Sequence, residues 1–384
     1  PDHVIRIKSK PLIIKTEELI KIKKNSEYLS VIIKKYCDNY KKYFLKYRKE
    51  IIGSEISDPL PRIIILQGYG FLSIGRNIKE EKIARDIFSS MKDSILDATL
   101  VGKFKSISKK EVFKMEYWPL ERAKLNNKKR KSLEGNVAVI TGGGGTIGMA
   151  VAKKFIKEGL AVVLIDQKFE KKSIKNHEIL NQCIQIKCNL TKDSEIDNAI
   201  NKIIHLFGGI DILISNAGAA FQGLIDGVSE KIIRDSFDIN FYSHQKIIQK
   251  IIYIMKLQNM GGSIMFNLSK QAVNPGKNFG PYGLAKSSAL FLMKQYALEV
   301  GKYNIRVNGI NADRIKSGIL TKKLIHQRSK ARNTTVKKYL SSNLLKQEVL
   351  PEDVADAFFA QIFLKKTTGN IITVDGGNIE ASLR

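Results

Sequence analysis

Two kinds of hydrophobic spacing divide this chain of 384 residues. From about Leu133 onward, short apolar runs rich in Val and Ile alternate with segments whose apolar residues recur every three or four positions. The runs predict buried strands, and the other segments predict helices between them. The strand candidates are Val137–Ile140, Ala161–Ile165, Ile184–Cys188, Ile212–Ser215, Ser263–Asn267, Ile305–Ile310 and Ile371–Val374. This alternation implies right-handed crossovers, so we expect residues 133–384 to form an α/β, doubly wound parallel-sheet Rossmann domain.

Residues 1–132 show a different pattern and form a separate, smaller region. Between residues 27 and 47, Tyr40, Tyr43, Phe44 and Tyr47 recur at three- and four-residue steps. That spacing predicts one face of a long amphipathic helix, for which core packing is a better explanation than a cofactor-binding stripe. An apolar run at 63–66, a glycine turn at 68–70 and a helical pattern at 79–96 follow. Helix, strand, turn and helix predict a small α/β N-terminal region.

A glycine-rich turn separates the first strand of the larger domain from the next helix, at Thr141-Gly-Gly-Gly-Gly-Thr-Ile-Gly148. Glycines allow the backbone to approach the pyrophosphate of a dinucleotide, and free N–H groups at the helix start favour its negative charge. The candidate cofactor-binding residues of this turn are Gly142, Gly145, Thr146, Ile147 and Gly148. A plain loop is the alternative, because glycine-rich turns also occur without a ligand.

A carboxylate ends the second predicted strand. Asp166 follows Gly148 by eighteen residues, where it can accept hydrogen bonds from the adenosine ribose and repel a 2′-phosphate. We therefore expect NAD as the cofactor in preference to NADP, although the neighbouring Lys168 keeps NADP open. The alternative is an ordinary aspartate in a turn at the strand end.

The formal net charge is +28, which suggests nucleic acid as a partner. Lysines are spread over both halves of the chain, however, and the tight basic cluster Lys128-Lys129-Arg130-Lys131 falls where a linker is expected. We expect a solvated basic surface with no specific nucleic-acid binding, while weak nonspecific contacts with polyanions stay open.

Other classes of protein are disfavoured by what the sequence lacks. No apolar run reaches the roughly 18 residues of a membrane span, and the first residues do not resemble a signal peptide. Three cysteines without a Cys-x-x-Cys pair favour a reducing, cytoplasmic compartment. The five histidines are scattered, so we expect no metal site, and His244 and His326 are interpreted as surface or packing residues.

Further motifs in the larger domain together resemble the short-chain dehydrogenase/reductase family. They are Asn216-Ala217-Gly218, Asn240 in a helical segment, Ser269 at a strand end, Tyr282-Gly-Leu-Ala-Lys286 and Val374-Asp-Gly-Gly377. The resemblance implies a Rossmann fold and the catalytic residues Asn240, Ser269, Tyr282 and Lys286. It also implies cofactor contacts from Asn189, Leu190, Asn216, Ala217, Gly218, Tyr282 and Lys286.

A second set of residues has the same spacing as the catalytic set. Tyr242 and Lys246 also form Tyr-x-x-x-Lys, and Ser229 precedes Tyr242 by thirteen residues, as Ser269 precedes Tyr282. Ser229 lies before a helical segment and suits a helix N-cap, whereas Ser269 ends an apolar strand. Because sites in open α/β sheets lie beyond the carboxyl ends of strands, the Tyr282 set is favoured.

The chemistry follows from hydride transfer, which requires a proton to move at the substrate oxygen. A free phenol has a pKa of about 10, and we expect the cation of Lys286, one helical turn from Tyr282, to lower that pKa. Tyr282 would be the general acid/base and Ser269 would hydrogen-bond the substrate oxygen. The resemblance gives Asn240 the role of holding a water that links Lys286 to solvent.

The chain departs from the family pattern at several positions. Thr146 replaces a glycine of the turn, Asn189 replaces an aspartate, Lys270 follows the catalytic serine, and Ala312-Asp313 replaces Pro-Gly. A one-residue shift of the loop would place Lys270 at the serine position, which puts activity in doubt.

A subfamily accounts for several of these departures. Segments 1–6, 116–121, 269–276 and 311–315 resemble bifunctional class II aldolase (rhamnulose-1-phosphate aldolase)/short-chain dehydrogenase proteins. On that resemblance, residues 1–132 are the connector and tail of an aldolase module, whose zinc-binding histidine cluster this sequence lacks. We assign no aldolase activity, and since Pro1 replaces an initiator Met, we expect a piece or processed product of a longer chain.

The sequence therefore predicts an NAD-dependent dehydrogenase for a small hydroxylated or aldehyde substrate, such as lactaldehyde or a sugar derivative. The resemblance also implies a homo-oligomer, a dimer or tetramer. The alternative is a catalytically weak scaffold whose basic N-terminal region binds a polyanion.

Overall fold

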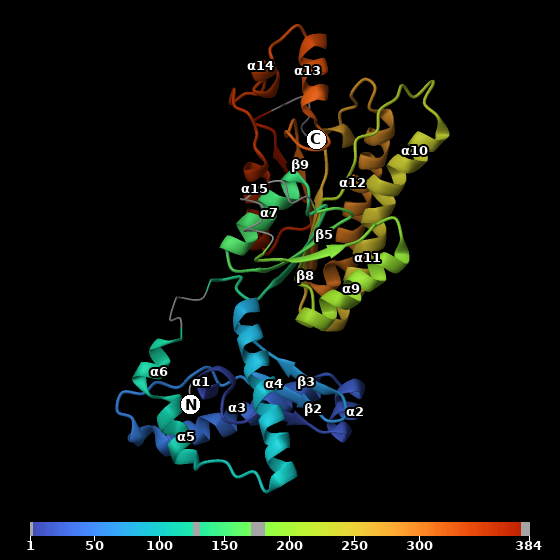
Figure 1. Cartoon of the computed structure of the whole chain (residues 1–384). Coiled ribbons are helices and arrows are strands. Elements are labelled where there is room, and N and C mark those ends of the chain that lie inside the picture. Colours follow the sequence, from blue (N-terminus) through green and yellow to red (C-terminus); the bar gives the residue numbers. More distant parts are fainter. Residues whose placement is uncertain (1–2, 126–130, 170–180, 378–384) are drawn as a thin grey trace. The chain divides into compact units, whose positions relative to one another are not determined.

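The chain divides after Gly135 into two units, Pro1–Gly135 and Asn136–Arg384 (Figure 1). A computed structural model describes residues 3–125, 131–169 and 181–377. The border lies close to the one between residues 132 and 133 that the hydrophobic pattern predicts. Within the described ranges, no helix combines the length and the apolar character that crossing a membrane requires.

A seven-stranded sheet with all neighbouring strands parallel forms the centre of the second unit. Its order is β10-β9-β8-β7-β4-β5-β6. The bounds are β4 (Val137–Thr141), β5 (Ala161–Asp166), β6 (Ile184–Lys187), β7 (Ile212–Ser215), β8 (Gly262–Asn267), β9 (Ile305–Ala312) and β10 (Ile371–Val374). The central residues of β4, β5, β7, β8 and β9 are buried on both sides of the sheet, which is why these strands are mostly apolar in sequence. The two outer strands, β6 and β10, are less buried.

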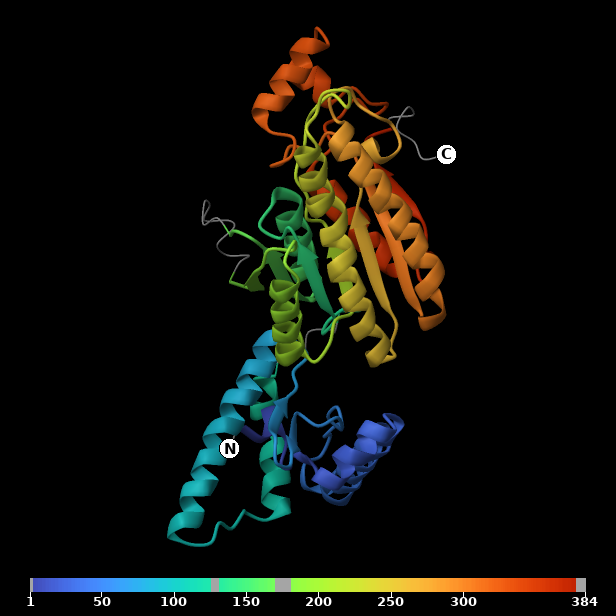
Figure 2. The same cartoon turned by 90° about the vertical axis from the view of Figure 1, so that its right-hand side faces the viewer.

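Helices cover both faces of this sheet, as Figures 1 and 2 show. On one side α7 packs against α15, and on the other α11 packs between α9 and α12. The helices are α7 (Thr146–Lys157), α9 (Asp193–Phe207), α10 (Glu230–Phe237), α11 (Ser243–Gln258), α12 (Gly280–Val300), α13 (Lys322–Ala331), α14 (Val336–Leu340) and α15 (Pro351–Phe363). There are also three short helical turns: η2 (Asp238–Tyr242) joins α10 to α11, η3 (Lys270–Ala272) precedes α12, and η4 (Gly301–Tyr303) follows it. The fold is the doubly wound Rossmann type that the sequence predicts.

The sheet also fixes where a site can form. After β4 the chain continues into β5 and β6 on one side, and then crosses to β7 on the other side. This reversal leaves a crevice at the carboxyl ends of β4 and β7, the position at which open α/β sheets bind ligands.

The first unit has its own three-stranded sheet, in which β1 (Leu12–Ile14) is parallel and β3 (Gly70–Ser73) antiparallel to β2 (Ile63–Leu66). Successive residues of β2 face opposite sides, because side chains alternate along a strand. Ile63 packs with Phe88 of α4 on one face, and Ile64 packs with Ile32 of α3 on the other. The helices are α1 (His3–Ile7), α2 (Thr16–Lys24), α3 (Glu27–Tyr47), α4 (Ile78–Val101), α5 (Lys109–Glu116) and α6 (Pro119–Ala123), with the turn η1 (Arg48–Glu50).

The aromatic stripe of α3 is a packing surface. Phe44 lies 5.2 Å from Tyr117 between ring centroids, and Tyr43 lies 5.6 Å from Phe113. These rings form a core with α5, which confirms core packing as the reason for the three- and four-residue spacing.

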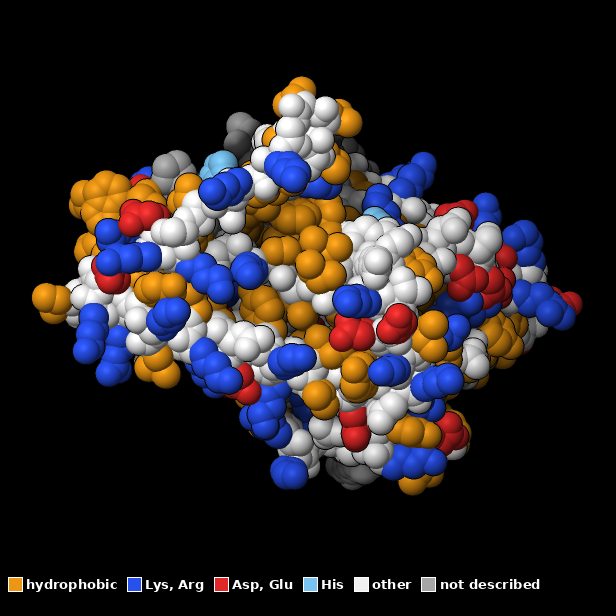
Figure 3. Space-filling view, turned by 90° about the horizontal axis from the view of Figure 1, so that it is seen from below, with side chains coloured by type: hydrophobic (Ala, Val, Ile, Leu, Met, Phe, Trp, Pro, Cys, Tyr) orange, Lys and Arg blue, Asp and Glu red, His pale blue; other side chains and the backbone are white. Residues whose placement is uncertain are grey.

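Basic side chains do not gather in one place on the face that Figure 3 shows. Lys and Arg are dispersed there among hydrophobic and acidic side chains. Of the basic cluster predicted at 128–131, residues 128–130 lie outside the described residues.

Candidate active site

The glycine turn joins β4 to α7 with close backbone approaches that a side chain would prevent. Gly142 has φ +62°, and a Cβ atom there would come 2.9 Å from the Cα of Ala217. A Cβ on Gly148 would come 2.3 Å from the carbonyl oxygen of Gly142. Thr146 replaces a family glycine without strain, because it is the first residue of α7 and has helical backbone. The N-terminus of α7 therefore opens toward the crevice, as pyrophosphate binding requires.

Asp166 lies at the end of β5 and faces the glycine turn. Its Oδ2 accepts a hydrogen bond of 2.9 Å from the backbone N–H of Gly144, and Oδ1 accepts one of 3.3 Å from Lys168. The carboxylate is thus fixed beside the turn, at the distance along the chain that suits a ribose-binding residue.

A cleft of about 630 Å³ runs along these elements. That volume lies in the range of ligand-binding pockets, and together with the glycine cradle it fits a dinucleotide. The cleft is lined by ten of the predicted cofactor residues, namely Gly142, Gly145, Thr146, Ile147, Asp166, Asn189, Leu190, Asn216, Ala217 and Gly218. Gly148 is buried beneath the turn.

Asn189 is less available than the sequence suggests. Its Oδ1 already accepts hydrogen bonds from Thr191 N (3.0 Å), Thr191 Oγ1 (2.9 Å) and Gln167 Nε2 (3.1 Å). A cofactor group that donates a hydrogen bond to this oxygen would have to displace one of them, most readily the exposed Gln167 amide.

Asn216 and Ala217 hold the cleft floor to the glycine turn. The Thr141 hydroxyl accepts hydrogen bonds from the backbone N–H groups of Asn216 (2.9 Å) and Ala217 (3.1 Å). Asn216 Nδ2 donates to the carbonyls of Thr141 (3.0 Å) and Gly142 (3.2 Å). These bonds join β4 to β7 at the point where the strand order reverses.

Asn240 sits in a π-helical turn, η2, between α10 and α11. Such turns interrupt α-helices frequently at functional sites. The fully buried Asn240 uses both polar atoms on Ala219: Oδ1 accepts from its N–H (3.1 Å), and Nδ2 donates to its carbonyl (3.0 Å). The side chain therefore supports the loop after β7, which leaves it little capacity to hold a water.

Lys286 lies behind this loop. Its Nζ donates to the carbonyl oxygen of Asn267 (2.9 Å), and a Cβ on Gly218 would be 3.8 Å from the same nitrogen. Burial lowers the pKa of Lys286 to about 8. An ammonium group has three protons, so two remain beyond this bond. The buried Lys286 is not among the residues that line the cleft or the cavity beside it.

Tyr282 and Ser269 line the same cavity, and their side chains interact. Burial raises the pKa of Tyr282 to about 12, and the interaction with Ser269 opposes that rise. Lys286 Nζ lies 5.9 Å from the centroid of the Tyr282 ring. The expectation that Lys286 brings the phenol pKa below its ordinary value is wrong for this structure, because desolvation outweighs the distant cation.

A second cavity of about 100 Å³ adjoins the cleft, and Ser269 and Tyr282 line it. The two spaces share Ile147, Asn267, Ser317 and Ile319 as wall residues. Cofactor-sized and substrate-sized spaces therefore meet beside the Ser269–Tyr282 pair.

The departure at Lys270 does not shift the loop. Ser269 keeps the position beside Tyr282, while Lys270 Nζ forms an ion pair of 2.8 Å with Asp313 Oδ2. The competing motif is separate from these residues. Tyr242 is 47% exposed, and Lys246 pairs with Asp193 at 3.0 Å.

The structure adds residues that the motifs did not identify. His244 is buried, with Nδ1 2.6 Å from Ser215 Oγ, and burial followed by the charge of Lys286 lowers its pKa. Of the two expected positions for His244, packing and surface, the structure shows the packing position. Asn267 connects Lys286 to Asn216, whose Oδ1 accepts from Asn267 Nδ2 at 2.8 Å. The spacing of these residues along the sequence could not predict their contacts, because the contacts join separate strands and helices. Among the described residues, no three His, Cys, Asp or Glu side chains could hold a metal ion.

Similarity to known proteins agrees with this geometry. Residues 136–328 match the family model of short chain dehydrogenases, and residues 1–125 match that of the second domain of class II aldolases. The uncharacterized oxidoreductase YuxG of Bacillus subtilis is 30% identical over 98% of the chain, which spans 57% of YuxG. The 7alpha-hydroxysteroid dehydrogenase of Escherichia coli is 29% identical over 65% of the chain and 96% of its own length.

Solved structures give the same result for the second unit. A 3-ketoacyl-(acyl-carrier-protein) reductase from Brucella melitensis, complexed with NADH, has a TM-score of 0.56 and 26% identity, covering 64% of this chain and 99% of that one. An NAD⁺-bound xylitol dehydrogenase has the same fold, with a TM-score of 0.59 and 23% identity over 64% of this chain and 100% of that one. The chain thus belongs to the short-chain dehydrogenase family of oxidoreductases, with a class II aldolase second domain as its first unit.

Proposed function

We propose that the second unit is an NAD-dependent dehydrogenase that transfers a hydride between nicotinamide and a small hydroxylated or aldehyde substrate. The observation that carries this proposal is that Ser269 and Tyr282 together line the small cavity that adjoins the dinucleotide-sized cleft. NAD, when bound, would supply the carbon that accepts or donates the hydride. A cavity of about 100 Å³ suits a substrate of few carbon atoms, such as lactaldehyde or a small sugar derivative.

Tyr282 would handle the proton in this reaction. A phenol whose pKa is raised to about 12 stays protonated at neutral pH, so it can donate its proton to a carbonyl oxygen during reduction. Ser269, which lines the same cavity, would donate to the same oxygen and stabilise the charge that develops there. In the oxidative direction the deprotonated form, the Tyr282 phenolate, would accept the alcohol proton and return to the phenol.

Lys286 and Asn240 would act behind the tyrosine. The Lys286 ammonium, anchored on the Asn267 carbonyl, would bind ribose hydroxyls with its other protons. Since the Asn240 side chain is committed to Ala219, we assign it a positioning role for the 217–219 loop in place of the expected side-chain water site.

NAD is the proposed cofactor in preference to NADP. Support comes from the carboxylate of Asp166, which the glycine turn holds at the cleft wall and which would repel a 2′-phosphate. Lys168 lines the same cleft and is the residue that would favour NADP. Dissociation constants for the two cofactors test the preference directly.

Replacement of Tyr282 by Phe tests the enzyme assignment. We expect NAD-linked turnover of small polyols or aldehydes to fall by about 10²–10⁴, while NAD still binds. Tyr242→Phe is the matched control, because Tyr242 belongs to the competing Tyr-x-x-x-Lys motif and lines neither cavity. Unchanged turnover in Tyr282→Phe would instead favour the alternative, a catalytically weak scaffold.

We also propose that the second unit forms a homo-oligomer. Large apolar side chains are exposed along α11 and α12: Tyr253 (63%), Leu257 (65%), Leu284 (49%), Phe291 (70%) and Leu298 (79%). Apolar surface at this density marks a protein interface more often than solvent-facing helix. Light scattering would measure the number of subunits, and a monomer would contradict the proposal.

A further inference from the structure

The first unit contains a polar cavity of about 200 Å³ that none of the dehydrogenase residues line. It lies among the end of α1, the loop at 57–62, the start of α4 and helices α5 and α6. Five cationic side chains line it: Arg6, Lys8, Arg62, Arg76 and Arg122. Three carboxylates, from Asp58, Glu80 and Glu116, share the lining. The walls therefore carry more positive than negative side chains.

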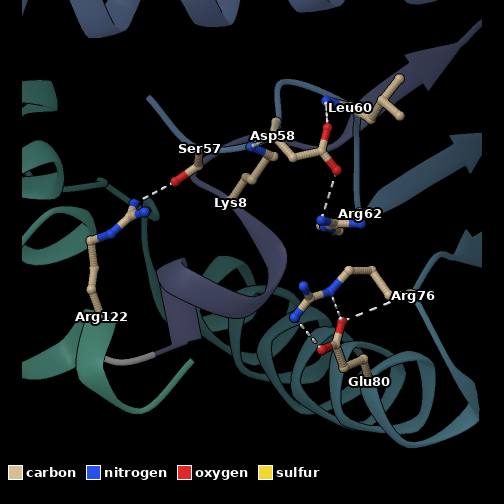
Figure 4. Close-up of polar contacts among 8 residues, drawn as sticks. All are labelled: Lys8, Ser57, Asp58, Leu60, Arg62, Arg76, Glu80 and Arg122. Carbon is tan, nitrogen blue, oxygen red and sulfur yellow. Dashed lines mark hydrogen bonds and ion pairs between the residues drawn. The ribbon is translucent and has the colours of Figure 1, made fainter. Parts of the chain in front are cut away.

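Two of the cations are already paired with carboxylates. Arg62 Nη2 lies 2.9 Å from Asp58 Oδ2. Arg76 donates to both carboxylate oxygens of Glu80, from Nη2 at 2.7 Å and from Nε at 3.1 Å. Figure 4 shows these two pairs on one side of the loop that carries Ser57 and Asp58. Their charges largely cancel within the wall.

The other three cations contact neutral oxygens. Arg6 Nη2 donates to the Lys124 carbonyl at 3.1 Å, and Lys8 Nζ donates to the Asp58 carbonyl at 2.5 Å. Arg122 Nη1 donates to Ser57 Oγ at 2.5 Å, from the opposite side of the loop in Figure 4. A guanidinium has five N–H donors, so Arg6 and Arg122 each keep donors beyond these bonds.

Glu116 is the carboxylate left to balance these three cations. It is 3% exposed, and its Oε1 accepts a hydrogen bond of 2.6 Å from Tyr40. Burial raises the pKa of Glu116, so its negative charge is less secure than that of an exposed glutamate. Burial lowers the pKa of Lys8 to about 8, so its amine is still mostly protonated at pH 7. At that pH, three cations against one carboxylate leave an excess of about two positive charges at the cavity.

Lys8 occupies a backbone position that does not favour lysine. It follows α1 with φ +63°, where glycine or asparagine commonly ends a helix. Its Nζ is held 3.6 Å from the centroid of the Tyr40 ring, and the residue is 8% exposed. A charged group held in unfavourable backbone and removed from solvent is a feature of binding sites more than of packing.

We propose that this cavity binds a small oxyanion with two negative charges, through Arg6, Lys8 and Arg122. The excess charge matches a dianion, and arginine forks match the oxygen geometry of phosphoryl and carboxylate groups. The volume is below the 300–1,000 Å³ typical of pockets for larger ligands, which favours a phosphate monoester or a short dicarboxylate over a nucleotide.

The test uses the full chain with inorganic phosphate and succinate as probes, and with chloride at equal ionic strength. Trp118 is the single tryptophan and lies at the start of α6, so its fluorescence follows the first unit. Because a ligand that binds the native state raises stability, we expect phosphate or succinate to raise the denaturation midpoint of this signal above that in chloride. The stronger probe in calorimetric titration identifies the source of the dianion.

Variants then locate the site. Arg6→Ala and Arg122→Ala should each weaken binding by about tenfold or more, as expected for loss of a charged hydrogen bond. Arg48→Ala is the control, because Arg48 is exposed in the same unit and does not line the cavity. If Arg122→Ala fails to fold after losing its contact with the Tyr117 ring, Arg122→Lys keeps the charge and removes the fork.

Several outcomes would overturn the proposal: no saturable binding beyond the chloride control, equal losses in Arg48→Ala, or unchanged affinity in both Arg6→Ala and Arg122→Lys. These results leave the dehydrogenase proposal untouched, since Tyr282 lies in the other unit. Turnover by the second unit should be the same in all of the arginine variants.

Discussion

The ammonium nitrogen of Lys270 lies 2.8 Å from the carboxylate of Asp313. The two side chains are 14% and 10% exposed, and both line the proposed substrate cavity. Lys270 and Asp313 are the positions at which the sequence departs from the family pattern around the catalytic serine and after the sixth strand. The ion pair explains the two departures together, because each residue supplies the partner that the other needs in a largely desolvated place.

This pair predicts unequal effects of its two single replacements. Asp313→Asn should cost more stability than Lys270→Met, because Arg314 Nε also lies 3.4 Å from Asp313 Oδ2 and would lose this carboxylate as well. We expect losses of about 1–3 kcal/mol, between the values for exposed and buried pairs. Urea unfolding followed by circular dichroism measures them. The double variant should recover part of the loss, and simple additivity would contradict the pairing.

Lys286 should make the stability of the second unit rise with pH. Its pKa is lowered to about 8 when folded, against 10.5 for the ordinary group, so the unfolded state binds more protons between those values. Unfolding free energy should therefore increase from about pH 8 to 10.5. Lys286→Met should be more stable than the parent chain at pH 7, with the difference shrinking above pH 8. A constant difference across this range would contradict the lowered pKa.

Gly148→Ala should abolish cofactor binding. The added Cβ would come 2.3 Å from the Gly142 carbonyl oxygen, so the turn must move away from α7. Gly301→Ala is the matched control, because Gly301 has φ −56° and nothing within 4 Å of an added Cβ. Quenching of bound NADH fluorescence or calorimetry would compare them. Equal affinity in the two variants would show that the turn does not hold the dinucleotide.

Asp166→Ser should shift the cofactor preference toward NADP. Removal of the carboxylate ends the repulsion of a 2′-phosphate, and Lys168 stays nearby to attract it. We expect the ratio of NADP to NAD dissociation constants to fall by about tenfold or more, equivalent to about 1.4 kcal/mol. An unchanged ratio would remove Asp166 from the cofactor site.

The larger fold was accessible from sequence because the five strands β4, β5, β7, β8 and β9 are largely buried on both faces and are therefore mostly apolar runs. In the first unit β1 and β3 were missed, since three- and four-residue strands with partly exposed faces carry little pattern. The three residues Asn240, Ser269 and Tyr282 follow from a resemblance. The thirteen-residue spacing from serine to tyrosine also fits Ser229 and Tyr242. Only the structure shows that Tyr242 lies outside both cavities.

What the sequence could not provide were properties that depend on distance and solvent. The Lys270–Asp313 pair joins positions 43 residues apart, and no spacing rule connects them. The pKa of Tyr282 was expected to fall because Lys286 is one helical turn away, yet burial raises it. The anion cavity in the first unit draws its three unpaired cations from α1, α6 and the residue after α1, which no local motif unites.

The hydrogen bond from the Gly144 N–H to Asp166 Oδ2 means that the carboxylate proposed to bind the ribose also supports the glycine turn. A Cβ on Gly144 would come 3.2 Å from that oxygen and 2.6 Å from the Lys168 carbonyl, so the contact tolerates no side chain. Any replacement of Asp166 therefore changes both the contact proposed for the ribose and the shape of the turn proposed to bind the phosphates. A redesign of this protein toward NADP cannot exchange Asp166 by itself. The redesign must also provide a new hydrogen-bond acceptor for the Gly144 amide. Without one, a gain in selectivity for NADP would come with a lower affinity for both dinucleotides.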